Sequence, residues 1–174
     1  MRRIRYSVAM SLDGYIAGPH GEFDWIVMDP DIDFAEMFKA FDTALMGRKT
    51  FEMAASGPPM PGVQTVVVSR SLKPADVPNG TVINEVSKTA LDALKAKPGK
   101  DIWLFGGGEL FRSLLAIGSV DSVEVAVIPV LLGGGIPLLP TPASRAKLVL
   151  NSHRLYPKTG TLVLEYGVQP AAAG

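Results

Sequence analysis

Short apolar runs and amphipathic stretches alternate over the first two thirds of the chain. Apolar runs without a helical period predict buried strands at residues 4–10, 43–46, 65–69, 81–83 and 102–105. In the first run, Tyr6, Val8 and Met10 share one face. The segment 11–25 is rich in glycine and aspartate and predicts a long loop after the first strand.

The amphipathic stretches predict four helices. Asp29 has the position of an N-cap with Pro30 at the first helical position, and Phe34, Met37, Phe38 and Phe41 would form the buried stripe. A second helix is expected from residue 47 to about 56, where the segment 57–62 breaks it. Two further helices are expected, one at about 88–97 with Ser87 as its cap and one at 109–117.

The last third has a different pattern, because three strand-like runs follow one another without a helix. They cover residues 122–130, 146–155 and 161–168, with a loop at 129–142. Alternating strands and helices followed by consecutive strands predict an α/β fold with a mainly parallel sheet and an antiparallel edge. We expect a single domain over residues 1–168 and a flexible tail at 169–174.

Composition narrows the class of protein. The 174 residues carry 17 basic and 17 acidic side chains, and no basic block favours nucleic acid. The absence of cysteine excludes disulfides and thiolate chemistry. Because the chain has only two histidines, a histidine metal site is not favoured. No apolar run has the roughly 20 residues that span a bilayer, and no signal peptide is evident, so we expect a cytoplasmic protein with no membrane or nucleic-acid partner.

Glycine- and serine-containing turns follow three of the predicted parallel strands. They are Gly47-Arg48-Lys49-Thr50, Ser69-Arg70-Ser71 and the segment from Phe105 through Gly107, Gly108 and Glu109. The carboxyl ends of parallel strands meet at one edge of a sheet, so the turns are expected to converge there. Glycines let an anion approach the N–H groups of a helix start, and Arg70 can clamp a phosphate. The alternatives are a solvated helix start at Arg48 and a plain polar turn at Ser69.

Four segments together resemble the dihydrofolate reductase-like superfamily, and in particular the branch built on the riboflavin-biosynthesis reductase domain. These segments are 11–18, 46–50, 106–108 and 128–135, and the similarity extends from about residue 3 to residue 166. The resemblance implies a three-layer fold with a central sheet of about eight strands, an antiparallel C-terminal hairpin, and NADPH as hydride donor.

The resemblance also implies where NADPH would lie. Ala9, Ile16 and Ala17 would line the nicotinamide under a mobile loop at 11–25. Residues 47–50 would hold the pyrophosphate and the adenosine side, and Ser69, Arg70 and Ser71 would meet the 2′-phosphate of the ribose. Gly107, Gly108, Glu109 and Leu110 would support the pyrophosphate from the second helix start.

The chain departs from dihydrofolate reductases at the first helix, where Phe34 takes the position of their pocket carboxylate. Phe34, Phe38 and Trp25 are therefore expected as walls of a substrate pocket. Asp33 and Asp24 are the candidate proton donors, with Asp13 and Tyr15 as alternatives.

The sequence thus favours an NADPH-dependent reductase of a small heterocyclic or carbonyl substrate that forms a homodimer. The alternatives are a non-catalytic NADP-binding module or sensor, and a structural dimer with a degenerate pocket.

Overall fold

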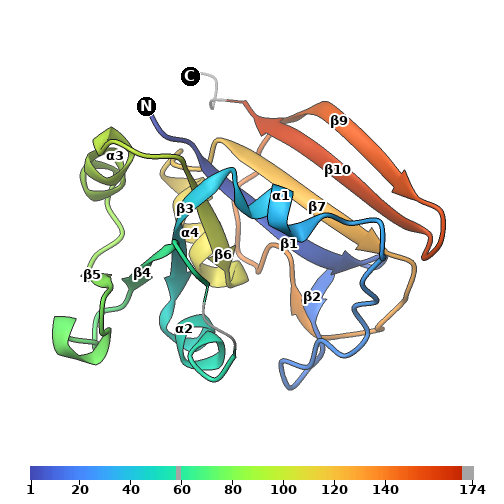
Figure 1. Cartoon of the computed structure of the whole chain (residues 1–174), viewed down its shortest axis with the longest axis horizontal. Helices are drawn as coiled ribbons and strands as arrows, with labels where there is room; N and C mark the ends of the chain where they lie inside the picture. Colours follow the sequence, from blue (N-terminus) through green and yellow to red (C-terminus); the bar gives the residue numbers. More distant parts are fainter. Residues whose placement is uncertain (58–59, 170–174) are drawn as a thin grey trace.

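The computed structural model describes residues 1–57 and 60–169. Eight strands form one sheet in the order β5-β4-β3-β6-β1-β7-β10-β9 (Figure 1). Their bounds are β1 Ile4–Ser11, β3 Phe41–Gly47, β4 Gln64–Val68, β5 Thr81–Ile83, β6 Asp101–Gly106, β7 Ser122–Ile128, β9 Leu148–Tyr156 and β10 Thr161–Val168. The strands from β5 to β7 in this order are parallel, whereas β10 is antiparallel to both β7 and β9. The predicted mainly parallel sheet with an antiparallel C-terminal hairpin is confirmed.

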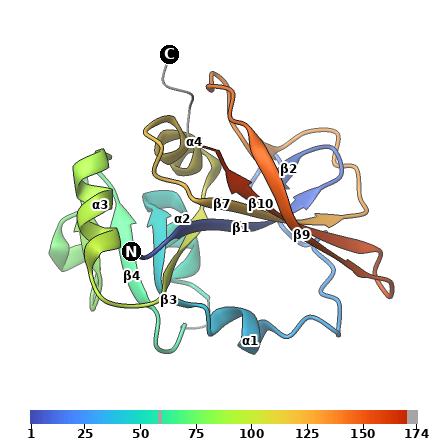
Figure 2. The same cartoon turned by 90° about the horizontal axis from the view of Figure 1, so that it is seen from above.

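Helices cover both faces of the sheet and complete three layers (Figure 2). They are α1 Phe34–Phe38, α2 Arg48–Ala54, α3 Lys88–Ala96 and α4 Gly108–Ala116, and a 3₁₀ turn covers Pro74–Asp76. Side chains of α3 and α4 pack with Ile4, Tyr6 and Leu104 in the larger core cluster. The side chains at alternate strand positions point to the opposite face of the sheet, where Phe105 packs beside α2 in a second hydrophobic core cluster. The two clusters explain why the central strands are apolar in nearly continuous runs.

The prediction of the first helix was wrong at both ends. Helix α1 begins at Phe34, Asp33 is its N-cap, and Phe41 already belongs to β3. Asp29 is buried and caps no helix; its carboxylate accepts hydrogen bonds from the N–H of Asp31 (2.9 Å) and from Thr159. Asp29 therefore ties the segment before α1 to the turn between β9 and β10.

A small second sheet was missed. Strand β2, Tyr15–Ala17, lies within the segment predicted as loop and pairs with β8, Ile136–Pro137. The other predicted elements are present with ends shifted by a few residues, and Ser87 caps α3 as predicted by accepting a hydrogen bond from the N–H of Ala90.

Two predicted irregular segments are described only in part. Residues 58–59 of the predicted helix break at 57–62 lie outside the described residues. The predicted tail begins at Gln169, whose N–H donates to the carbonyl of Lys147 at 3.0 Å, and residues 170–174 lie outside the described part. Within the described residues, no helix has the length and apolar character needed to cross a membrane.

Candidate active site

The three predicted turns lie side by side at the carboxyl edge of the parallel strands. Arg48, at the start of α2, donates a hydrogen bond from Nη1 to Ser71 Oγ (2.9 Å), which joins the turns after β3 and β4. A Cβ placed on Gly107 would lie 3.5 Å from Thr50 Oγ1, so the turn after β6 borders the first turn of α2. One edge of the sheet therefore carries all three turns, as expected for a ligand site in a parallel sheet.

The starts of α2 and α4 present backbone amides at this edge. Their N-caps are Gly47 and Gly107, and neither helix has a side-chain cap. The first N–H groups of a helix lack partners within the helix and attract anions. Leu110 is buried in the core, so only its backbone faces the edge, and the Glu109 carboxylate pairs with Arg112 at 2.5 Å.

The three consecutive glycines serve different purposes. Gly106 has φ +133°, which side chains rarely adopt, and the peptide bond from Gly106 to Gly107 is cis. Gly107 faces Thr50. Gly108 faces away from the amide edge, because its Cβ would lie 2.9 Å from Pro137 O and 3.0 Å from Pro140 Cδ. The glycine at 108 is thus required by packing against the 137–140 segment.

The turn after β4 is held from within. Ser69 is buried, and its Oγ accepts hydrogen bonds from the N–H groups of Leu72 (3.1 Å) and Ser71 (3.3 Å). Asn84 Nδ2 donates to the carbonyl of Ser69 at 3.0 Å. Ser69 therefore shapes the turn, while Arg70 and Lys49 are exposed beside it. Arg48 also pairs with Glu52, and this pairing raises the pKa of its guanidinium.

The segment predicted to be a mobile loop over the nicotinamide is tied to the glycine-rich segment after β7. The Asp13 carboxylate accepts hydrogen bonds from Ser11 Oγ (2.6 Å) and from the N–H groups of Leu132 (3.1 Å) and Gly133 (2.7 Å). The Ser11 hydroxyl, followed by these backbone donors, lowers the pKa of Asp13. The sequence interpretation considered Asp13 only as an alternative proton donor, and its contact with residues more than 100 positions away was missed.

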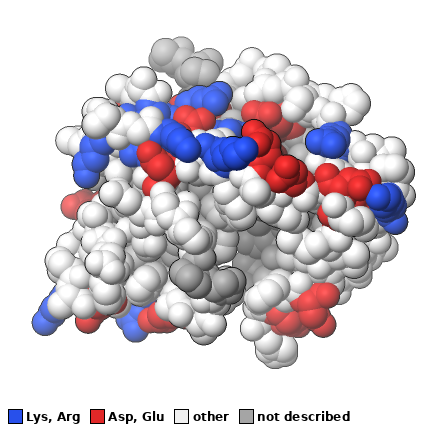
Figure 3. Space-filling view, in the orientation of Figure 1, with Lys and Arg blue, Asp and Glu red and all other residues white. Residues whose placement is uncertain are grey.

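Small side chains form the floor of the site. Ala9 on β1 pairs with Ala126 on β7, and both stay partly exposed in the interior of an eight-stranded sheet. Ile16 and Ala17 lie on β2, next to β1. Figure 3 shows a hollow in this face, between the surface formed by α2 and the surface around β2. The floor is therefore open to a flat ligand.

Aromatic side chains border the floor on the α1 side. The ring centroids of Phe34 and Phe38 lie 6.5 Å apart, and those of Phe38 and Trp103 lie 5.2 Å apart. Phe105 meets the Trp103 ring edge-on at 4.6 Å. Trp25 is half-buried and donates its indole N–H to Glu22 O (3.2 Å). The structure thus brings Phe34 and Phe38 together with Trp103, which the sequence interpretation had treated only as a buried strand residue.

The two candidate proton donors are exposed. Asp33 Oδ1 accepts the N–H of Glu36 at 2.9 Å as the cap of α1, and Asp24 lies in the segment before it. A carboxylate not considered from the sequence, Glu124, lies on β7, and Ser7 Oγ donates to its Oε1 at 2.6 Å. The sequence pattern that could have indicated Glu124 is a single acidic residue within an apolar strand.

Other concave surfaces lie away from these residues. One, of about 390 Å³, lies between Arg112, Ser113 and Ala116 of α4 and residues 142–144. In the described part of the chain, no group of three or more His, Cys, Asp or Glu side chains is arranged to hold a metal ion.

Comparison with known proteins agrees with this geometry. Residues 2–162 match the RibD C-terminal domain. The chain belongs to this family. It is 33% identical to the uncharacterised protein YyaP of Bacillus subtilis (strain 168) over 183 residues, covering 95% of this chain and 94% of YyaP. Membership in the RibD C-terminal domain family confirms the resemblance inferred from the four segments.

Two solved structures show the fold. A protein of Shewanella sp. PV-4 named for riboflavin biosynthesis superimposes with a TM-score of 0.83 at 23% identity, covering 98% of this chain and all of that one. Dihydrofolate reductase from Enterococcus faecalis, complexed with NADP(H) and RAB-propyl, superimposes with a TM-score of 0.71 at 20% identity and 97% coverage of both chains. The RibD C-terminal domain of this chain therefore has the dihydrofolate reductase-like fold.

Proposed function

We propose that the protein is an NADPH-dependent reductase that transfers a hydride to a C=N or C=O bond of a small heterocyclic or carbonyl substrate. The observation that carries this proposal is the meeting of three turns and two helix starts at one edge of the sheet, next to an open floor at Ala9 and Ala126. Backbone amides suit a pyrophosphate, and the exposed cations Arg70 and Lys49 suit a further phosphate. The binding of NADP(H) by the E. faecalis enzyme of the same fold supports the choice of cofactor.

NADPH would supply the hydride, and this chain would supply placement. The amides of residues 107–110 and the α2 start would bind the pyrophosphate. Arg70, Ser71 and the Ser69 turn would meet the 2′-phosphate. Ala9, Ile16 and Ala17 would border the nicotinamide, because their small or apolar side chains leave room for a flat ring and exclude water. Asp33 and Asp24 remain the proposed proton donors, either directly or through water.

The test is a titration with NADPH and with NADH that follows tryptophan fluorescence. Removing Arg70 costs a charge-assisted contact of about 1.5–3 kcal/mol, which corresponds to roughly 10- to 150-fold weaker NADPH binding. The Kd for NADH, which lacks the 2′-phosphate, should be the same in Arg70→Ala and wild type. Arg154→Ala is the matched control, because Arg154 is exposed on β9, six strands from β4, or about 29 Å at the usual strand spacing. Equal affinity for both nucleotides in the wild type would refute the proposal.

A non-catalytic NADP-binding module or sensor is the second candidate. The use of the Asp33 carboxylate as a helix cap favours it, because that carboxylate is already engaged by the N–H of Glu36. Tight NADPH binding without NADPH oxidation across a panel of cyclic imines, pteridines and carbonyl compounds would select this function.

We also propose that the protein forms a homodimer through its edge strand β9. Leu148, Val149, Leu150 and Leu155 expose between 44% and 60% of their surface on this strand. An exposed apolar edge strand is a template for pairing with another chain. Sedimentation equilibrium should give a dimer that Leu150→Lys dissociates, and a monomeric wild type would remove this proposal.

A further inference from the structure

The central strand β1 is fully covered on one face and only partly covered in the middle of the other. It lies between β6 and β7, with Ile4 and Tyr6 fully buried at 0% exposure under α4. The alternate residues Ser7 and Ala9 point to the other face and remain partly exposed. Helix α1, with five residues, is too short to cover this face. A partly covered stretch in the middle of a sheet, with small side chains and few polar groups, suits the floor of a ligand site.

A polar pair lies on this partly covered stretch. Ser7 pairs with Glu124 in the β1–β7 register, one alternate position before Ala9 and Ala126. The Ser7 hydroxyl donates to Glu124 Oε1 at 2.6 Å, while the Ser7 carbonyl accepts the indole N–H of Trp103 at 3.0 Å. Ser7 is therefore held from both sides, next to the aromatic border of the site.

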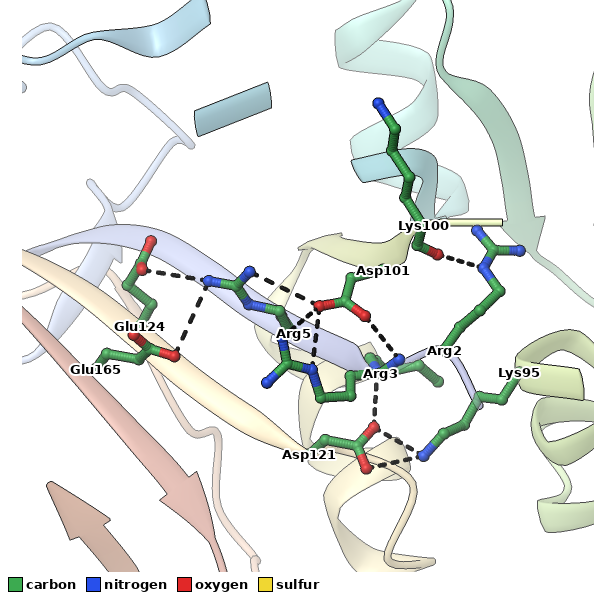
Figure 4. Close-up of polar contacts among 10 residues, drawn as sticks. Arg2, Arg3, Arg5, Lys95, Lys100, Asp101, Asp121, Glu124 and Glu165 are labelled. Atoms are coloured by element: carbon green, nitrogen blue, oxygen red, sulfur yellow. Dashed lines mark hydrogen bonds and ion pairs between the residues drawn. The ribbon is translucent and has the colours of Figure 1, made fainter. Parts of the chain in front are cut away.

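The Glu124 carboxylate belongs to a cluster around Arg5 (Figure 4). Arg5 lies 3.6 Å from Glu124, 4.0 Å from Glu165 and 3.8 Å from Asp101, and Arg3 also pairs with Asp101. Two arginines face three carboxylates, so the cluster has a formal charge of −1. Because Glu124 and Glu165 carry the same charge and share Arg5, a difference between them in ligand binding would come from the position of Glu124 beside Ser7.

The hydrogen-bond direction within the pair decides what it can bind. The Ser7 proton is committed to Glu124, so the remaining lone pairs of Ser7 Oγ can only accept. The Glu124 carboxylate, which lies beside Arg5, also has acceptor oxygens, and its side chain is 20% exposed. The pair thus offers acceptor atoms to the site, beside a flat floor of two alanines.

We propose that Ser7 and Glu124 form the polar end of the substrate pocket and select a flat heterocycle that presents an amino or ring N–H edge. The carboxylate that α1 does not provide would come from β7. This inference rests on the proposed function, because it places the heterocycle beside the nicotinamide, but it depends on a different set of residues.

The probe is 2,4-diaminopyrimidine, whose two amino groups present N–H donors, and its binding is measured by calorimetry with and without saturating NADPH. Glu124→Gln and Ser7→Ala should each weaken its binding about 10-fold or more, as expected for loss of a hydrogen bond to a charged group. Glu165→Gln is the matched control. Glu165 also faces Arg5, but it accepts a hydrogen bond from Ser152 on β9, and its variant should stay within about twofold of wild type. 1,3-Dimethyluracil has no N–H donor and should not distinguish the variants.

The outcomes separate the two proposals. The inference is overturned if NADPH quenches the tryptophan fluorescence but 2,4-diaminopyrimidine does not bind, or if Glu124→Gln and Glu165→Gln lose the same affinity for it. Either result leaves the reductase proposal standing. If 2,4-diaminopyrimidine binding depends on Glu124 but the protein does not bind NADPH, the reductase proposal is overturned and the Ser7–Glu124 site is supported. Thermal melting and the quenching of tryptophan fluorescence by NADPH show whether each variant is folded. If Glu124→Gln is unfolded, Ser7→Ala still tests the pair.

Discussion

Gly108 links the packing of α4 to the proposed cofactor edge, and Gly108→Ala tests this link. The added Cβ would lie 2.9 Å from Pro137 O and 3.0 and 3.1 Å from two carbons of the Pro140 ring. Ordinary contact begins at 3.4 Å, so the start of α4 and the 137–140 segment must separate by 0.3 to 0.5 Å (3.4 − 3.1 and 3.4 − 2.9). A carbonyl and a proline ring cannot rotate away. Overpacking of this kind costs about 1–3 kcal/mol.

For a chain of this length, 1 kcal/mol corresponds to roughly 2–4 °C in Tm, so Gly108→Ala should lower Tm by roughly 2–12 °C in a calorimetric or circular dichroism melt. The shift also displaces the α4 amides, so the Kd for NADPH should rise. Gly134→Ala is the control, because a Cβ there meets nothing within 4 Å, and its Tm should stay within about 2 °C of wild type or rise slightly. Equal melting of both variants and wild type would refute the packing argument.

Three further variants test the contacts that hold the site together. The pKa of Asp13 in the folded protein lies below its ordinary 3.8, so Asp13 stabilises the fold fully above pH 3.8 and loses this contribution as the pH falls through the folded pKa. Asp13→Asn should therefore lower the Tm at pH 7 and make the Tm decrease less between pH 7 and pH 2, as measured by thermal melts over this range. Asp29→Asn should weaken the tie to Thr159 and speed hydrogen exchange in residues 18–33, with exposed Asp24→Asn unchanged. Ser69→Ala removes the acceptor for the N–H of Leu72 and should reduce the preference for NADPH over NADH, and an unchanged preference would contradict the role given to this turn.

The sheet and the turns of the proposed cofactor edge were predictable because their signals are local. A buried strand, a glycine and a helix start follow one another within about ten residues at 43–50 and 102–110. Each unit specifies its own geometry, and the common direction of parallel strands then brings the turns to one edge. No contact between distant residues had to be known to expect the meeting of Arg48 and Ser71.

The segment before α1 was not predictable in the same way. Asp29 followed by Pro30 has the form of an N-cap, and the hydrophobic spacing after it continues through Phe41. What decides the outcome is the contact of Asp29 with Thr159, 130 positions later, which holds its carboxylate away from a helix start. The strand pairing of Phe41 with Asp101 also outweighs its place in the helical stripe. Tertiary contacts overrode a local pattern at both ends.

The proposed polar end of the substrate pocket depends on strand register rather than on a sequence motif. Ser7 and Glu124 are 117 positions apart, and they meet only because β1 and β7 pair with Arg5 opposite Ser122. Since neither residue shapes a turn or fills the core, either can change without disturbing the amides that would hold NADPH. We therefore expect chains that share the turns after β3 and β6 to have different residues at these two positions when their substrates differ. The glycine motifs would then indicate the cofactor, and the β1–β7 pair would indicate the substrate.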